Sequence, residues 1–319
     1  MNKPLLSIVI ANYNYGRFLD EAIRSVIAQN MGDQVELIIV DGGSTDNSAE
    51  IIKKYANGLP PNISYTDWIN SSNHNSQTPP LITWWCSEKD GGQSAAFNKG
   101  FSHARGRFLT WLNADDVMLP GVIDALKTAS ERDPWQEWFV GGVYWLDPQM
   151  NVIRCGRARH MSRIRAEYGL VNVGGPCSFF TKDLYERAGK IDERHHYTMD
   201  TDLWLRFALN ENVAFKPCIR YAWGLRLHPD AKMSGHNFNA DGTLAANAFS
   251  SEALHKEEKK RKQLQFEEEA TRAKLPPVKG KMNRVLSLLT ADYIPALLSR
   301  FDTRRFAGQN YRKICGGAS

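Results

Sequence analysis

An amide and two adjacent carboxylates, Asn113, Asp115 and Asp116, come directly after the apolar run Phe108–Leu112. Two neighbouring carboxylates repel each other, and a divalent cation beside them relieves that repulsion. Mg²⁺ and Mn²⁺ prefer such oxygen ligands and take few carboxylates from the protein. The residues therefore indicate a cation site at the end of a strand. They could instead cap a helix, because aspartate is favoured where a strand turns into a helix.

Short apolar runs alternate with amphipathic segments through the first 112 residues. The sequence predicts strands at Ser7–Ala11, Glu36–Val40, Leu81–Cys86 and Arg107–Leu112, with a further strand at 63–68. Helices are expected between them, at Phe18–Gln29, Ala49–Tyr55 and Ser94–Arg105. This alternation, at roughly 30 residues for each strand and helix, is typical of βαβ units and a parallel sheet.

Polar residues follow all four of the main predicted strands. They are Asn12–Asn14, Asp41–Ser44, Glu88–Gly92 and Asn113–Asp116. In a parallel sheet the carboxyl ends of the strands share one edge, and ligands bind beyond that edge. Each segment alone would pass for a turn or a solvated loop. Four of them together favour a single ligand site on that edge.

The bulk composition fits a globular protein without a membrane span. Apolar residues make up 42 % of the chain and charged residues 24 %, which are ordinary values. No apolar run reaches the roughly 18 residues that a spanning helix needs. The N-terminus reads as a first strand rather than a signal peptide. The five cysteines form no C-x-x-C pair, which favours buried thiols in a reducing cytosol over disulfides or zinc.

The positive charge lies in the C-terminal part. Residues 251–319 hold 15 Lys/Arg and 8 Asp/Glu, so the other 25 Lys/Arg and 27 Asp/Glu leave the body near neutral. We therefore expect no nucleic-acid partner. The basic run 279–315 also carries an apolar face, so it either contacts a membrane surface or packs on the body or on a partner subunit. The sequence leaves a homo-oligomer open.

Five runs of the chain resemble glycosyltransferase family 2, in the order that the family has them. They are SIVIANYNYGRFLDEAIRSVIAQ, ELIIVDGGSTDNS, EKDGGQSAAFNKGFSHARGRFLTWLNADD, GGPCSFFTKDLYERAGKIDERHHYTMDTDLWLRF and LRLHPDAKMS. The resemblance implies the GT-A fold, an α/β fold with a Rossmann-like, mostly parallel sheet and helices on both faces. It also implies inverting transfer of a sugar from a nucleotide-diphosphate donor, with UDP favoured, to a hydroxyl of a saccharide or lipid-linked saccharide. The implied setting is bacterial surface polysaccharide synthesis in the cytoplasm, at the inner face of the membrane.

The resemblance covers most of residues 5–235 and implies the domain division. Residues 1–245 would form the catalytic domain, with a nucleotide-binding half over 1–112 and an acceptor half over 113–245. Residues 246–319 lie outside the resemblance, and we expect a charged, basic helical extension there.

The resemblance also implies a role for residues at the predicted edge. Asp115 would bind Mn²⁺ or Mg²⁺ together with His228, and Asp116 would support the metal–phosphate contact or the donor sugar. Asn113 would face the ribose, although the family usually has aspartate at this position. The nucleotide-side residues are Ala11 through its backbone, Tyr13 by stacking on the base, Asp41, Asp90 and, beside the phosphates, Lys99.

The family motif matched by MDTDLW implies that Asp200 is the catalytic base. An inverting transfer needs one base that accepts the proton of the incoming hydroxyl. The family often has glutamate where Met199 stands, so one supporting acid is missing. Asp200 or Asp202 could instead serve the first turn of a helix, where negative charge is favourable. His195 and His196 would line the acceptor pocket without a catalytic role.

Rival functions make different demands on the sequence. A catalytically inactive, nucleotide-sugar-binding regulator or scaffold is the main alternative, because Asn113 and Met199 replace acids of the family. A nucleotidyltransferase would need a glycine-rich basic loop where Ala11–Asn14 stands. A dinucleotide-binding oxidoreductase would need G-x-G-x-x-G, which the sequence lacks.

Overall fold

Four parallel strands form the half of the sheet that contains the N-terminus. They are β1 (Leu6–Asn12), β2 (Val35–Asp41), β3 (Trp84–Ser87) and β4 (Phe108–Asn113). Asn12 is in register with Asp41, Asp41 with Ser87, and Ala11 with Asn113. The strand ends therefore meet along one edge, as the sequence predicts. The computed structural model describes residues 3–29, 34–57, 59, 61–62, 82–158, 163–167, 173–232, 256 and 293–315, so the strand predicted at 63–68 lies outside the described residues.

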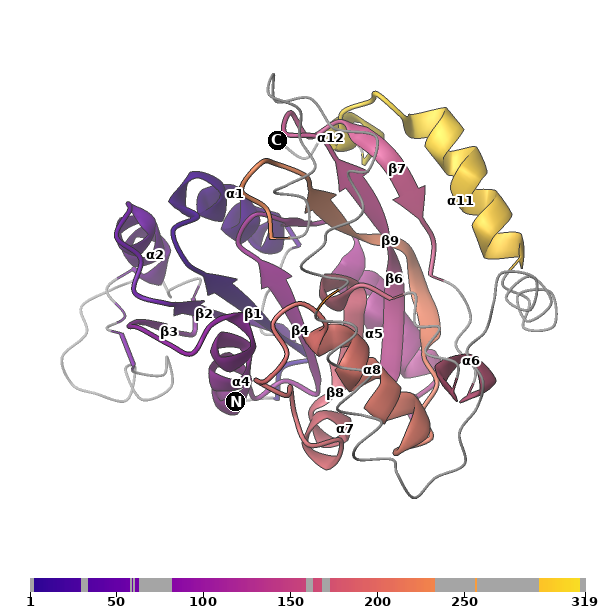
Figure 1. The fold of residues 1–319 in the computed structure, drawn as a ribbon, viewed down its shortest axis with the longest axis horizontal. Coiled ribbons are helices and arrows are strands. Elements are labelled where there is room, and N and C mark those ends of the chain that lie inside the picture. The colour runs from indigo at the N-terminus through magenta and orange to yellow at the C-terminus, as the bar shows by residue number, and fades with distance from the viewer. Residues whose placement is uncertain are drawn as a thin grey trace.

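The other strands extend the same sheet. They are β5 (Val117–Met118), β6 (Trp138–Leu146), β7 (Val152–Gly156), β8 (Ser178–Thr181) and β9 (Lys216–Arg226). The order is β3-β2-β1-β4-β8-β6-β9-β5, and β7 pairs with β6 (Figure 1). β8 runs antiparallel to β4 and to β6, whereas β9 is parallel to β6. Strands from before and after residue 113 thus belong to one mixed sheet, and the predicted boundary between two halves stays a prediction.

Helices pack on both faces of the sheet because successive apolar residues of each strand point to opposite faces. Ile8 and Ile10 belong to the cluster that contains α1 (Gly16–Ile27), α2 (Ser48–Ala56) and α5 (Val122–Arg132). The intervening Val9 belongs to the opposite cluster, with α4 (Gln93–His103), α7 (Lys182–Arg187) and α8 (Met199–Leu209). The short helices α6 (Arg163–Glu167) and η2 (Gly175–Cys177) complete this part. Two-sided burial explains why the parallel strands are almost wholly apolar.

The described end of the C-terminal extension packs on the body. It comprises α11 (Tyr293–Phe306) and α12 (Tyr311–Ile314), and α11 runs beside β7 (Figure 1). Asp302 on α11 is fully buried and accepts hydrogen bonds from Arg157 at 2.7 Å, from Arg220 and from the hydroxyl of Tyr221. Residues 293–315 therefore contact the body, and a membrane contact through their exposed side stays a prediction. Within the described part of the chain, no helix combines the length and apolar content needed to cross a bilayer.

We predict that Asp302→Asn lowers the free energy of unfolding by about 3 kcal/mol, because it leaves the guanidinium groups of Arg157 and Arg220 without their shared carboxylate. Arg304→Ala, at an exposed position of the same helix, should change it by less than about 0.5 kcal/mol. Urea denaturation followed by circular dichroism measures both. Equal effects of the two changes would show that the buried carboxylate does not hold α11 in place.

Candidate active site

Asp115 and His228 lie side by side although 113 residues separate them. Asp115 follows β4 and His228 follows β9, and Asp115 Oδ2 is 3.1 Å from His228 Nε2. The His228 side chain is buried against Phe18, with ring centroids 4.5 Å apart, whereas Asp115 keeps partial exposure. The structure therefore brings together the two residues expected to bind a metal.

The spacing of this pair fits two ligands of one divalent cation. Adjacent ligands of an octahedral ion, each at about 2.1 Å, lie about 3 Å apart. Mn²⁺ accepts an imidazole nitrogen beside oxygen ligands more readily than Mg²⁺ does, and both ions commonly leave several positions to phosphate oxygens and water. Asp115 and His228 would thus hold such an ion from one side and leave its other side to a substrate.

Asp116 serves the frame of the site rather than its open side. Its side chain is buried, and its oxygens accept hydrogen bonds from Asn113 Nδ2 at 2.7 Å and from the backbone N–H of Arg226 at 3.0 Å. Burial, and after it the negative charge of Asp115, raise the pKa of Asp116 well above the ordinary value for aspartate. Asp116 therefore joins the end of β4 to the end of β9, and it would support a metal–phosphate contact by holding Asp115 and His228 together.

Asn113 sits in a chain of hydrogen bonds that runs across the site. Its amide oxygen accepts from Gln93 Nε2 at 2.9 Å, and Gln93 Oε1 accepts from Lys232 Nζ at 2.8 Å. A carboxylate in place of Asn113 would face Asp116 across the same short contact and repel it. The amide is thus explained by its neighbours, and its contact with a ribose stays a prediction.

The nucleotide side of the edge is built around Asp41. Its side chain is fully buried and accepts hydrogen bonds from Asn12, Ser44 and Ser87. Asn12 and Ser87 stand at the carboxyl ends of the neighbouring strands β1 and β3, and Ser44 lies in the turn after β2. Asp41 therefore orders these turns, and its direct contact with a base stays a prediction.

Tyr13 and Asp90 are the more accessible residues on this side. Tyr13 is 60 % exposed, and Asp90 keeps partial exposure. A Cβ added to Gly42 would lie 3.3 Å from Asp90 Oδ2 and 3.4 Å from Tyr13 Cδ2, so the bare backbone of Gly42 separates a ring from a carboxylate. This arrangement suits a flat, hydrogen-bonding ligand such as a nucleobase or ribose.

Two other predicted nucleotide residues receive less support from the geometry. Ala11 is only partly buried and is paired with Asn113 in the sheet, which places its backbone at the edge. Lys99 is on the second turn of α4, and its ammonium group lies 2.9 Å from Glu88 Oε1. The phosphate contact of Lys99 stays a prediction, and it would require Lys99 to exchange Glu88 for a phosphate.

Asp200 and Asp202 have separate roles at the start of α8. Asp202 is buried and forms an ion pair with Arg206, one turn later, at 2.7 Å. Asp200 is less buried and accepts the backbone N–H of Thr201 at 2.6 Å, one of the amides that the first turn leaves without a helical partner. The residue at the N-cap is Thr198, so neither aspartate caps the helix. Burial raises the pKa of the Asp200 carboxyl, and the hydrogen bonds from Thr201, and after them the positive charge of Lys232, partly offset this.

The first turn of α4 connects the start of α8, which carries Asp200, to the strand end that precedes Asp115. Gln93 bonds Asn113 at the end of β4, and the adjacent Ser94 donates to the backbone oxygen of His195 at 2.7 Å and to Met199 Sδ at 3.1 Å. Met199 is buried in that contact, where the family often has an acid. The sequence motif DGGQS contains these two residues, yet their role depends on which segments fold against them.

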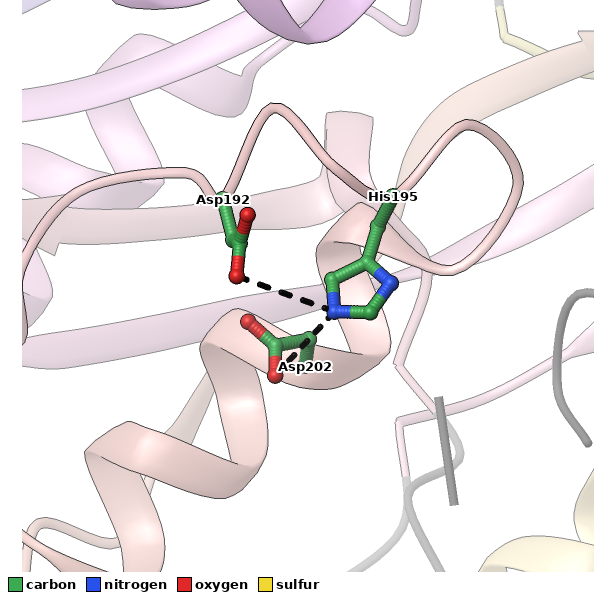
Figure 2. A group of neighbouring side chains, drawn as sticks. All are labelled: Asp192, His195 and Asp202. Carbon is green, nitrogen blue, oxygen red and sulfur yellow. Dashed lines mark ion pairs between the residues drawn. The ribbon is translucent and has the colours of Figure 1, made fainter. Parts of the chain in front are cut away.

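A second group of ionisable residues lies close by on the loop before α8. His195 Nε2 is 3.9 Å from both Asp192 Oδ2 and Asp202 Oδ1 (Figure 2). These atoms are close enough to hold an ion, but Arg194 bonds Asp192 and Arg206 bonds Asp202. The hydrogen bonds from Arg194 lower the pKa of Asp192 to about 2. Because each carboxylate is paired with an arginine, the group is better explained as a set of contacts that stabilises the loop than as a metal site. His195 is buried within the group, and its place beside an acceptor stays a prediction.

Comparison with known proteins supports the family resemblance. The sequence model described as "Glycosyl transferase family 2" matches residues 7–136. This stretch of the chain is therefore similar to glycosyltransferase family 2. The chain is 25 % identical over 214 residues to an uncharacterized glycosyltransferase of Methanocaldococcus jannaschii, covering 66 % of the chain and 67 % of the relative. An uncharacterized glycosyltransferase of Nostoc is 38 % identical over 115 residues, which are 36 % of the chain but only 29 % of that relative.

A solved structure of similar fold confirms the expected architecture. The crystal structure of S. aureus TarS residues 1–349 in complex with UDP has a TM-score of 0.50 and 15 % identity, over 70 % of this chain and 61 % of that one. At this identity the likeness concerns the fold, so the α/β, GT-A architecture predicted from the sequence is confirmed. The chain spans less than two thirds of the length of TarS and of the Nostoc relative.

We predict that Asp200→Asn stabilises the protein at pH 7 whereas Asp202→Asn destabilises it. Because the pKa of Asp200 is raised on folding, the folded state binds this proton more tightly than the unfolded state does. The associated stability is present while the carboxyl is protonated and is lost as the pH rises through the raised pKa.

The amide removes that loss, so the gain in the urea midpoint should shrink as the pH is lowered towards the ordinary pKa of aspartate. Asp202→Asn breaks the contact with Arg206 and should lower the midpoint. If Asp200→Asn destabilised as strongly as Asp202→Asn, both aspartates would be structural.

Proposed function

We propose that the chain is a metal-dependent, inverting glycosyltransferase that moves a sugar from a nucleotide-diphosphate donor, with UDP favoured, to a hydroxyl of a saccharide or lipid-linked saccharide. The observation that carries the proposal is the first turn of α4, which contacts both the end of β4 and the start of α8. This turn supports the proposal because it connects the strand end beside Asp115 and His228 with the start of α8, where the pKa of Asp200 is raised.

The donor would bind along the carboxyl edge of the strands. Tyr13 and Asp90, on either side of Gly42, would contact the base and ribose, and the buried Asp41 would keep the turns in place. Asp115 and His228 would hold Mn²⁺ or Mg²⁺, which would offset the negative charge that builds on the departing diphosphate. Lys232, at the far end of the hydrogen-bond chain through Gln93, adds a positive charge on the same side.

Asp200 would act as the general base. A carboxylate with a raised pKa holds the proton of an acceptor hydroxyl better than an ordinary aspartate does. Attack by that hydroxyl from the face opposite the diphosphate would invert the anomeric carbon in one displacement. Asp202 is ion-paired with Arg206, so Asp200 is the acid at the start of α8 that would be available for this role.

A catalytically inactive nucleotide-sugar-binding regulator or scaffold is the alternative. Its sequence support was the replacement of two family acids by Asn113 and Met199. Both residues have defined hydrogen-bonding partners, with Gln93 and Asp116 for Asn113 and Ser94 for Met199. Their presence is therefore compatible with a working site, and an assay has to separate the two functions.

The test combines binding with turnover. Thermal shift with UDP, GDP and dTDP sugars, with and without Mn²⁺, should show stabilisation that depends on the ion, because a ligand of the folded state raises the melting temperature. Asp115→Asn should lose the Mn²⁺-dependent part. Asp200→Asn should keep binding and lose transfer by at least about 100-fold, the usual contribution of a general base. Binding without turnover in the wild type, across saccharide acceptors, would favour the regulator.

The biological setting is part of the proposal. The minor teichoic acid biosynthesis protein GgaB of Bacillus subtilis is 32 % identical over 119 residues, which are 37 % of this chain and 11 % of that protein. This likeness supports a role in bacterial surface polysaccharide synthesis, at the cytoplasmic side of the membrane. A homo-oligomer stays a prediction.

The sequence suggests that the segment 279–315 contacts a membrane. The structure describes residues 293–315 of it, and the proposal is argued from these. Arg300, Arg304 and Arg305 are exposed on α11, so their positive charge is available to anionic lipid headgroups. Phe301 is exposed beside them and offers an apolar contact. The double change Arg304→Glu/Arg305→Glu should abolish co-sedimentation with phosphatidylglycerol vesicles, while Lys127→Glu on α5 should not. Equal binding to neutral phosphatidylcholine vesicles would contradict the electrostatic contact.

A further inference from the structure

One carboxylate on α1 connects the C-terminal segment to the metal pair. Glu21 Oε2 pairs with the guanidinium of Arg226, and Glu21 Oε1 pairs with that of Arg312 on α12. Arg226 ends β9, two residues before His228, and its backbone N–H bonds Asp116. Arg312 therefore lies two ion pairs from the strand end that carries His228.

The side chain of Arg226 is tightly enclosed. It is 6 % exposed, and its guanidinium lies 4.6 Å from the centroid of the Phe18 ring, which in turn packs against His228. A change in the ion pair between Glu21 and Arg226 would therefore reach His228 by two routes. One is the Phe18 ring, and the other is the backbone at 226–228. Each oxygen of Glu21 serves one arginine, so the loss of Arg312 would free the second oxygen to move towards Arg226.

A second contact of the same segment supports the strand after the acids. Tyr311 is buried in a cluster with Val117 and Leu119, the residues that follow Asp116. The backbone N–H of Tyr311 donates to the oxygen of Met150 at 3.1 Å, which fixes α12 to the turn between β6 and β7. The segment thus packs behind the residues that follow Asp116 and is linked through Glu21 to the strand end that carries His228.

We propose that residues 293–315, beyond the stretch matched by the family model, are a positioning element of the cation and diphosphate site. Glu21 and Arg312 are positioning residues, which act through Arg226 on His228. The inference rests on the proposed function, because it assumes that Asp115 and His228 hold an ion beside a diphosphate.

The test measures the affinity of the full-length protein for Mn²⁺ and for UDP by isothermal titration, with UDP titrated in the presence and absence of Mn²⁺. Arg312→Ala should weaken Mn²⁺ binding and Mn²⁺-dependent UDP binding by about three- to fivefold, as expected for a partly exposed ion pair. Binding of UDP without the ion should not change. Arg312→Lys should restore most of the loss, and Arg312→Ala should add nothing further to Glu21→Gln.

Arg304→Ala, an exposed arginine of the same segment, is the matched control and should behave as the wild type. If Arg312→Ala matched Arg304→Ala while the wild type bound both ligands, the positioning role would be wrong and the proposed function would stand. If the wild type bound neither Mn²⁺ nor UDP, the proposed function and the positioning role would both be wrong. A loss that Arg312→Lys did not restore, accompanied by a lower melting temperature, would indicate a general effect on stability and overturn the inference.

Discussion

The register of the parallel strands is the constraint on which the site depends. Because β1 is paired in register with β2 and β4, and β2 with β3, their ends present Asn12, Asp41, Ser87 and Asn113 along one edge. A slip of one residue would turn each of these side chains to the other face of the sheet. The two-sided apolar core prevents such a slip, since it would also bury the wrong residues. The chemistry at the edge is therefore fixed by packing far from it.

Buried carboxylates are costly, and the chain uses them in two different ways. Asp41 and Asp302 are fully buried but surrounded by donors, so they fasten segments that are distant in sequence. Asp116 and Asp200 have fewer compensating contacts, and burial raises the pKa of each. Strain of this kind is expected where a protein keeps a group ready for a charged partner or for a proton. Of these two acids, Asp116 holds the ends of β4 and β9 together, whereas Asp200 is the one that the proposed function uses as a base.

Much of the first half could be predicted from the sequence, because each strand there is a continuous apolar run followed by polar residues. The pairing of Asp115 with His228 needed the family resemblance, since no local pattern links positions 113 residues apart. β5 was missed because two residues carry no periodicity, and it exists only through its pairing with β9. The roles of Gln93 and Ser94 depend on the segments that fold against α4, as does the assignment of Asp202 rather than Asp200 to an ion pair. The docking of α11 involves a buried aspartate, Asp302, that looks like any surface charge in the sequence.

The central claim is that the cation lies between Asp115 and His228, next to a diphosphate, and not in the group of Asp192, His195 and Asp202. Electron spin-echo spectroscopy of Mn²⁺ bound with UDP tests it directly, because the ion reports both nitrogen and phosphorus nuclei in its ligands. The account predicts a ¹⁴N coupling together with a ³¹P coupling, with the nitrogen coupling lost in His228→Ala and kept in His195→Ala. A nitrogen coupling that survives in His228→Ala and disappears in His195→Ala would contradict it.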